Sequence, residues 1–125
     1  MNYLLDISVL VALLFKNHTH HAPARAWLSG KKPILCPLSE LGFIRVAMSS
    51  AHNATMEEAR KALADFYADE GAEMLPADIS ALDGNPAPSA GKSTDWYMAN
   101  LAAEHEMKWA TFDKGANHPA RELVS

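Results

Sequence analysis

The stretch YLLDISVLVALLF, residues 3–15, decides the fold class of this sequence. Tyr3–Asp6 is a short apolar run that ends in an acid, which predicts a first strand. Ser8 is expected to cap a helix that reaches Phe15, because the apolar side chains after it recur at helical spacing. This helix is apolar around most of its girth, so we expect it to be buried.

The rest of the chain continues this alternation of strands and helices. Helices are predicted at about residues 23–28, 39–48, 55–70 and 95–105, and strands at 34–36, 73–75 and 108–112. The caps expected for three of these helices are Ser39, Thr55 and Thr94. Residues 77–92 predict a long loop, and the tail after Asp113 is expected to be loose. The pattern indicates an α/β fold of three layers, in which helices cover both faces of a short parallel sheet.

The bulk properties favour one small domain. The length of 125 residues fits a single domain over residues 1–125. The first apolar run contains Asp6, has no basic residue before it and is too short to span a bilayer, so we expect a cytoplasmic protein without a membrane segment. The single Cys36 suits a reducing compartment. The net charge of −4 argues against a nucleic-acid partner, unless several of the acids together hold a cation.

Four acids occupy positions that suggest chemistry. Asp6 ends the first strand and Asp113 follows the last one, while Glu40 and Asp95 each open a helix directly after a capping residue. In open α/β sheets, ligands bind outside the carboxyl ends of the strands, and the helices that follow strands begin at the same edge. Carboxylates gathered there would repel one another unless a cation neutralised them, and oxygen ligands suit Mg²⁺ or Mn²⁺. The pattern therefore predicts an acidic metal site.

Each acid also has an ordinary interpretation. Glu40 or Asp95, taken singly, is explained equally well by the helix dipole, which favours an acid in the first turn by about 0.3–1 kcal/mol. Asp113 alone could be a turn acid. Asp6 is harder to explain in this way, because a carboxylate inside an apolar run needs a partner or a metal. The combination of the four favours the metal site.

The order of the motifs resembles that of PIN domains. The resemblance rests on the segments LLDISVL (4–10), SELGFIRV (39–46), TDWYM (94–98) and ATFDKG (110–115). More narrowly, the sequence is similar to the toxin ribonucleases of bacterial VapBC toxin–antitoxin pairs, from Met1 to about Gly115.

This resemblance implies a function and a set of site residues. It implies a PIN-like fold and a metal site formed by Asp6, Glu40, Asp95 and Asp113, with small polar residues beside the metal at Ser8 and Thr111. It also implies a metal-dependent endoribonuclease that cleaves single-stranded RNA with Mg²⁺ or Mn²⁺. The implied partners are a second copy of the chain in a homodimer and a cognate antitoxin.

The expected reaction is hydrolysis of an RNA phosphodiester bond by a metal-activated water, with one metal ion or two. Because water attacks, the products should carry a 5′-phosphate and a 3′-hydroxyl. Arg45, Lys92 and Lys114 are candidate phosphate contacts, although each of them is more often a solvated surface charge. Either Trp96 or Tyr97 is a candidate for stacking on a base.

Two other functions stay open at this point. A metal-dependent phosphatase would use the same acidic edge, but it usually needs a second carboxylate two residues after the nucleophilic Asp, where this chain has Ser8. A catalytically silent RNA- or protein-binding module with a PIN-like fold would not need all four acids. The histidines 18, 20 and 21 lack the partners and spacing of a zinc site and are interpreted as a polar loop.

Overall fold

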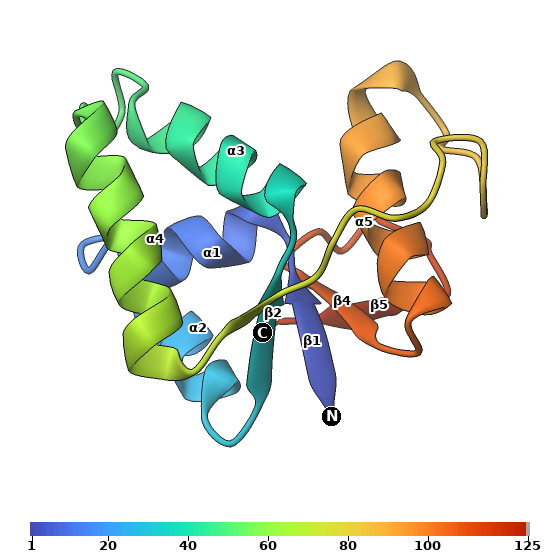
Figure 1. The fold of residues 1–125 in the computed structure, drawn as a ribbon, viewed down its shortest axis with the longest axis horizontal. Coiled ribbons are helices and arrows are strands. Elements are labelled where there is room, and N and C mark those ends of the chain that lie inside the picture. The colour runs from blue at the N-terminus through green and yellow to red at the C-terminus, as the bar shows by residue number, and fades with distance from the viewer. Residues whose placement is uncertain (125) are drawn as a thin grey trace.

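The computed structural model describes residues 1–124, and its centre is a five-stranded sheet in the order β3-β2-β1-β4-β5 (Figure 1). All neighbouring strands are parallel. The strands are β1 (Asn2–Leu5), β2 (Lys32–Leu35), β3 (Glu73–Met74), β4 (Lys108–Thr111) and β5 (Arg121–Leu123). The helices are α1 (Ile7–Leu14), α2 (His21–Leu28), α3 (Pro37–Ala47), α4 (Met56–Glu70) and α5 (Ser93–Glu104), with a short 3-10 turn, η1, at Ala90–Lys92.

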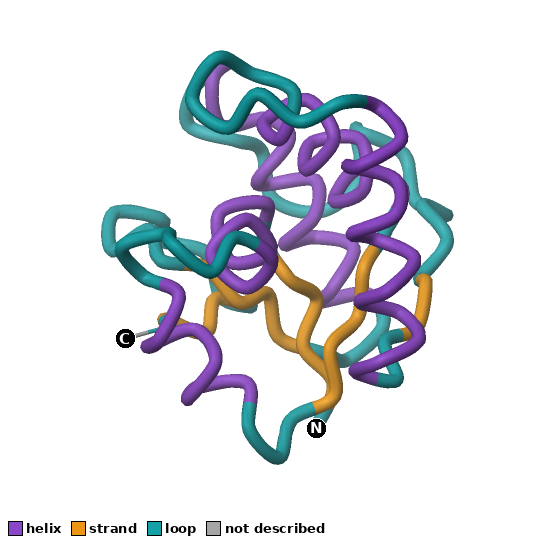
Figure 2. The backbone as a smooth tube through the Cα atoms, turned by 90° about the vertical axis from the view of Figure 1, so that its left-hand side faces the viewer, coloured by secondary structure: helices purple, strands orange, loops and turns teal. Residues whose placement is uncertain are grey.

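Helices cover both faces of this sheet, which confirms the predicted three-layer α/β/α fold. Side chains alternate along a strand, so Leu4 and Leu5 of β1 enter different cores. Leu5 packs with Leu35 against α1, α2, α3 and α4, and Leu4 packs with Trp109 against α5. Figure 2 shows the strands side by side with helices around them. A sheet buried on both faces accounts for strands that are short and apolar throughout.

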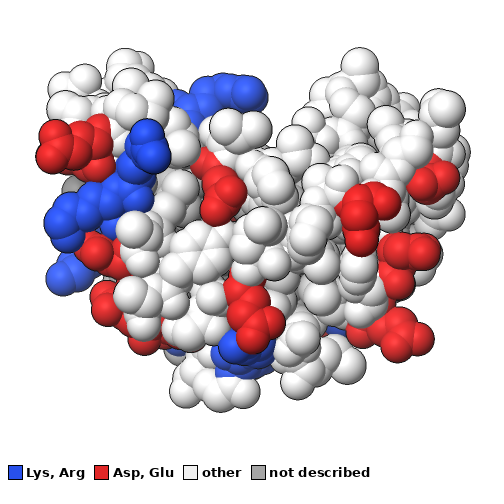
Figure 3. All heavy atoms as spheres, viewed as in Figure 1, with Lys and Arg blue, Asp and Glu red and all other residues white. Residues whose placement is uncertain are grey.

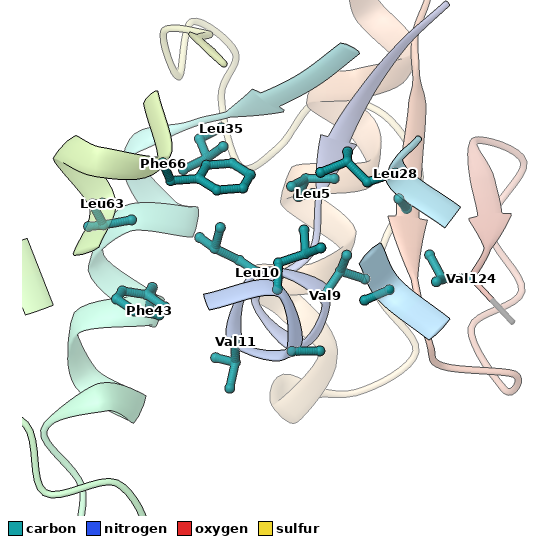
Figure 4. Packing of buried hydrophobic residues seen from close by; sticks show 14 of the residues in the cluster. Leu5, Val9, Leu10, Val11, Leu28, Leu35, Phe43, Leu63, Phe66 and Val124 are labelled. Carbon is teal, nitrogen blue, oxygen red and sulfur yellow. The ribbon is translucent and has the colours of Figure 1, made fainter. Parts of the chain in front are cut away.

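The first helix lies at the centre of the larger core. Val9 and Leu10 are fully buried, and Figure 4 shows Leu10 beside Leu5, with Phe66 of α4 on one side and Leu28 of α2 on the other. The prediction that this apolar helix is buried is therefore confirmed. Within the described part of the chain, no helix is long and apolar enough to cross a membrane.

The predicted cap of α1 is wrong. The helix begins at Ile7, and its N-cap is Asp6, whose Oδ1 accepts a hydrogen bond from the backbone N–H of Ile7 at 2.8 Å. Ser8 lies inside the first turn. Asp6 is thus the single residue that connects β1 to α1, and it caps the helix as well as following the strand.

Two further caps are displaced in the same direction. The third helix begins at Pro37 after the N-cap Cys36, since proline fits the first helical position; Ser39 lies inside the turn, buried, and donates to the Leu5 carbonyl at 3.2 Å. The last helix begins at Ser93, directly after η1, so Thr94 is not its cap. Thr55 does cap α4, in a reciprocal pair of hydrogen bonds with Glu58, and Gly71 ends that helix in a left-handed conformation.

The prediction of a loose tail after Asp113 is wrong. Residues 121–123 form β5, which pairs with β4 in parallel, and Val124 is buried against the larger core. The strand has three residues and two of them are charged, so no apolar periodicity predicts it. The long loop expected at 77–92 is confirmed, with η1 as its only helical turn among the described residues.

We predict that Gly42→Ala destabilises the protein by about 1 kcal/mol. A Cβ at position 42 would overlap the Cδ1 and Cγ1 atoms of Ile7. Overpacking costs about 1–3 kcal/mol, whereas replacing glycine inside a helix gains about 1 kcal/mol at most. Urea unfolding measures the change, and Gly91→Ala, which meets no atom within 4 Å, is the control. An unchanged midpoint for Gly42→Ala would show that α3 does not pack this closely on α1.

Candidate metal centre

The carboxyl ends of β1 and β4 meet where the strand order of the sheet reverses. From the central β1 the chain passes to β2 on one side and later to β4 on the other side. Ligands of open α/β sheets bind in the crevice at such a switch point. Asp6 directly follows β1, and Asp113 lies two residues after the end of β4. Figure 3 shows that the surface is hollowed between the part built on α3 and α4 and the part built on α5.

The Asp6 carboxylate is held rigidly at this edge. It is only 5% exposed. Its Oδ1 accepts from the N–H of Ile7, and its Oδ2 accepts from the hydroxyls of Ser8 at 2.9 Å and Thr111 at 2.8 Å. A carboxylate offers about four acceptor positions, so three donors leave room for one more partner. The two hydroxyl residues predicted to lie beside the site are thus the ones that orient Asp6.

Burial raises the pKa of Asp6 above its ordinary value. The three hydrogen bonds lower this pKa, but they do not offset the burial, and the negative charge of Asp113 raises it further. An ionised Asp6 is therefore unfavourable in the protein alone. A cation beside it would reverse that balance.

Asp95 lies close enough to Asp6 for the charge of Asp6 to shift its pKa. It lies in the first turn of α5 and is partly buried. Burial, followed by the negative charge of Asp6, raises the pKa of Asp95 to about 6, although Lys92 acts in the opposite direction. Asp95 lies in the first turn of α5, where the helix dipole favours an acid, and it is also close enough to Asp6 for the two charges to interact.

Asp113 is stabilised as an anion by its own partners. Its Oδ2 accepts from Lys92 Nζ at 2.7 Å, and its Oδ1 accepts from the Gly115 N–H at 2.9 Å. The Lys92 hydrogen bond, and then that of Gly115, lower the pKa of Asp113. The Thr111 hydroxyl accepts from the Asp113 N–H at 3.1 Å while donating to Asp6, so one side chain connects both acids.

Glu40 faces a different neighbour. Its Oε2 accepts from the Tyr67 hydroxyl of α4 at 2.8 Å. Burial and this contact with Glu40 raise the pKa of Tyr67. Glu40 is not among the groups that shift Asp6, Asp95 or Asp113. It lines a groove of about 490 Å³ between α3 and α4, together with Leu41, Arg60 and Tyr67. The structure thus brings three of the four predicted acids together, and Glu40 as a ligand stays a prediction.

The predicted RNA contacts lie in different settings. Arg45 and Lys114 are exposed. Of the basic side chains in residues 1–124, Lys92 is the one that forms an ion pair with a predicted site acid. Trp96 is buried in the smaller core, between α5 and the sheet. Tyr97 is partly exposed and donates its O–H to the Ile79 carbonyl at 2.7 Å. Tyr97 is therefore the member of the pair that a base could reach.

The donor set fits a hard divalent cation. Three carboxylates and two hydroxyls converge on one edge, and oxygen donors of this kind suit Mg²⁺ or Mn²⁺. Nowhere in residues 1–124 do three His, Cys, Asp or Glu side chains already stand in an arrangement that would hold a metal. The negative charges of Asp6, Asp95 and Asp113 repel one another, and Asp113 is paired with Lys92. Both effects oppose a close arrangement of the three carboxylates in the absence of a cation.

The family follows from comparison with known proteins. The model of the PIN domain family matches residues 3–122, so the chain belongs to that family. It is 32% identical to Ribonuclease VapC38 of Mycobacterium tuberculosis over 120 residues, covering 90% of this chain and 85% of the relative. It is 31% identical to Ribonuclease VapC29 of the same organism over 122 residues, covering 94% and 90%. The resemblance to VapC-type ribonucleases is thereby confirmed.

Solved structures share the fold. One is a crystal structure of VapBC2 from Rickettsia felis bound to a DNA fragment from the VapBC2 promoter. It superposes on this chain with a TM-score of 0.65 at 14% identity, and the superposition covers 100% of each chain. Mycobacterium tuberculosis VapC20, a Sarcin-Ricin loop cleaving toxin, gives a TM-score of 0.61 at 10% identity and covers 92% and 91%. Both likenesses confirm the three-layer fold.

Sequence reasoning missed the contact between Tyr67 and Glu40. Tyr67 is one position past the core residue Phe66 on α4, and nothing in its local sequence distinguishes it from a solvated helix residue. The Lys92–Asp113 pair spans 21 residues, so only the shared sheet edge could have indicated it.

We predict that Asp95→Asn flattens the pH dependence of stability in the metal-free protein. The pKa of Asp95 is raised from 3.8 to about 6, so its contribution stabilises the fold below about pH 4 and is lost as the pH rises through about 6. In urea unfolding with EDTA, the wild type should lose more stability over this range than Asp95→Asn. The exposed Asp65→Asn should keep the wild-type slope; the same slope for all three proteins would contradict the placement of Asp95 beside Asp6.

Proposed function

We propose that this protein is a metal-dependent endoribonuclease, the toxin of a type II toxin–antitoxin pair. The observation that carries the proposal is the buried Asp6 carboxylate at the switch point, whose pKa is raised by burial and by Asp113. A buried acid with two acids beside it needs a cation in order to be ionised. The similarity to the VapC ribonucleases supports RNA as the substrate.

Asp6, Asp95 and Asp113 would hold Mg²⁺ or Mn²⁺, and Glu40 would complete the site through water. When bound, a divalent cation supplies Lewis-acid activation of water and neutralises phosphate charge.

The chain's own residues orient the site and compensate charge. Ser8 and Thr111 hold the Asp6 carboxylate in one orientation through their hydroxyls, and Thr111 also fixes the backbone of Asp113. Lys92 lies within hydrogen-bond distance of Asp113, so its ammonium group is placed to pair with a phosphate of the RNA backbone. Through such contacts a chain with a net charge of −4 would bind RNA locally.

The proposed partners and location follow from the relatives. The VapBC2 structure supports a cognate antitoxin, and action in the cytoplasm is proposed from the similarity to the VapC ribonucleases. A homodimer is proposed from the family alone. The phosphatase alternative is less well supported, because Ser8 stands where a second carboxylate would be needed and instead donates to Asp6.

We predict that the protein cleaves single-stranded RNA with Mg²⁺ or Mn²⁺, and that EDTA abolishes the cleavage. Asp6→Asn keeps the shape of the side chain but removes its charge, and should lower the rate by at least about 100-fold, since even residues that only support metal ligands contribute about 10–100-fold. Asp65→Asn, on the exposed side of α4, should cleave like the wild type. The products should carry a 5′-phosphate and a 3′-hydroxyl.

Three results would contradict this function. A 2′,3′-cyclic phosphate product would exclude attack by water. Full activity of Asp6→Asn, in preparations where Asp65→Asn is also active, would show that the acidic edge is not the catalytic site. An inactive wild type whose melting temperature still rises with Mn²⁺ would favour the catalytically silent module.

A further inference from the structure

A row of aromatic and imidazole rings lies beside the acidic edge and has no part in the function proposed above. The His20 ring packs on Phe112 with centroids 5.1 Å apart, and His18 lies 5.8 Å from His20. Phe15 stacks on His52 with centroids 4.1 Å apart and an interplanar angle of 20°. We call these five residues the ring surface. The charge of His52 also lowers the pKa of His18, so the group formed by Phe15 and His52 lies near the group formed by His18, His20 and Phe112.

The loop between α1 and α2 holds these rings in place. His21, at the start of α2, contacts the carbonyl of Ala12 with its Nδ1 at 2.8 Å, which folds the loop back along α1. The Nδ1 of His18 accepts from the N–H of His20 at 3.0 Å, which fixes the ring of His18 relative to the next one. The rings are therefore ordered before any ligand binds, and binding would cost little conformational entropy.

The ring surface is continuous with the candidate metal centre. Phe112 stands between Thr111 and Asp113, the two residues that connect the acids. His20 is exposed, and the other four rings are partly exposed, so one side of the row is open to solvent. Phe112 is also packed against the larger core, so a strand of nucleic acid with a phosphate at the acids would meet the exposed ring of His20 first.

The chemistry of the row suits bases rather than a metal. The Phe15 and His52 rings are stacked with planes 20° apart, and the His20 and Phe112 rings are tilted by 32°. No three-ligand metal group occurs in residues 1–124. Burial, and then the neighbouring imidazoles, lower the pKa of His18.

Apart from Phe112, which adjoins Asp113, the rings lie on segments without acids. The loop at residues 15–21, which carries three of the rings and Lys16, contains no Asp or Glu, and neither does the segment 48–54 that carries His52. A cavity of about 260 Å³ opens beside Phe15 and His52, and Asn53 lines it. Its one acid, Glu58, is engaged by the N–H of Thr55.

We propose that the ring surface binds the unpaired bases of the single-stranded RNA next to the bond that is cleaved, by stacking them on His20 and Phe112 and further along on His18. This inference rests on the proposed function, because it takes RNA as the substrate of the acidic edge. Base stacking on aromatic rings tolerates any sequence and requires unpaired bases. The ring surface would thus select single strands over duplexes.

The test is the binding of a fluorescein-labelled 12-nucleotide single-stranded RNA in EDTA, where no cleavage occurs. His20→Ala should weaken binding about five-fold or more, as expected for one lost base stack. His20→Phe keeps a stacking ring and should bind within about two-fold of the wild type. His105→Ala, a histidine on α5's far end that pairs with Asp78, is the matched control and should bind like the wild type. A duplex of the same sequence should bind all four proteins more weakly than the single strand binds the wild type.

Three results would overturn the proposal: no RNA binding by the wild type, wild-type binding by His20→Ala, or equal losses for His20→Ala and His20→Phe. The melting-temperature rise with Mn²⁺ should be the same in His20→Ala and the wild type, which separates this surface from the acids. If binding follows the expected order but no RNA is cleaved with Mn²⁺, the proposed function fails and the ring surface stands. If RNA is cleaved but His20→Ala binds normally, only the ring surface fails.

Discussion

The buried carboxylate of Asp6 is the constraint on which the rest of the site depends. It ends the central strand and caps the first helix, so its backbone cannot shift without moving both elements. Hydroxyls from α1 and β4 fix its orientation, yet burial still raises its pKa. Packing alone is not expected to offset the cost of burying an ionised carboxylate at this position. The proposed cation would compensate this charge and would account for the acids around it.

The parallel sheet explains why distant residues meet around Asp6. β1 pairs with β2 on one side and β4 on the other, so Asp6 and Asp113 come from adjacent strand ends, and Asp95 comes from the helix that precedes β4. Ile7, packed on Gly42, fixes the distance between α1 and α3 directly beside Asp6. The stability of the two cores and the geometry of the metal centre are therefore linked through the same few residues.

Most of the fold was predictable because its signals are local. The apolar runs of β1 and α1 and the cap at Thr55 act over a few residues, and each is confirmed. β5 was not predictable, because its pairing with β4 stabilises it without an apolar pattern. The caps at Ser39 and Thr94 were wrong because Pro37 and the turn η1 start these helices earlier. Among the site residues, the strand ends predicted Asp6 and Asp113, and the start of a helix predicted Asp95. The start of a helix also predicted Glu40, but its side chain contacts Tyr67 across two helices, which the local sequence does not indicate.

The most direct test of a cation at Asp6 is anomalous diffraction from crystals of the protein soaked with Mn²⁺. We expect a peak at the carboxyl ends of β1 and β4, within coordination distance of the free acceptor side of Asp6 and of at least one of Asp95 and Asp113, with Lys92 displaced from its 2.7 Å contact to Asp113. Crystals of Asp6→Asn should lack the peak. A peak in the groove between Glu40 and Tyr67 instead, or no peak in the wild type at saturating Mn²⁺, would contradict the metal centre described here.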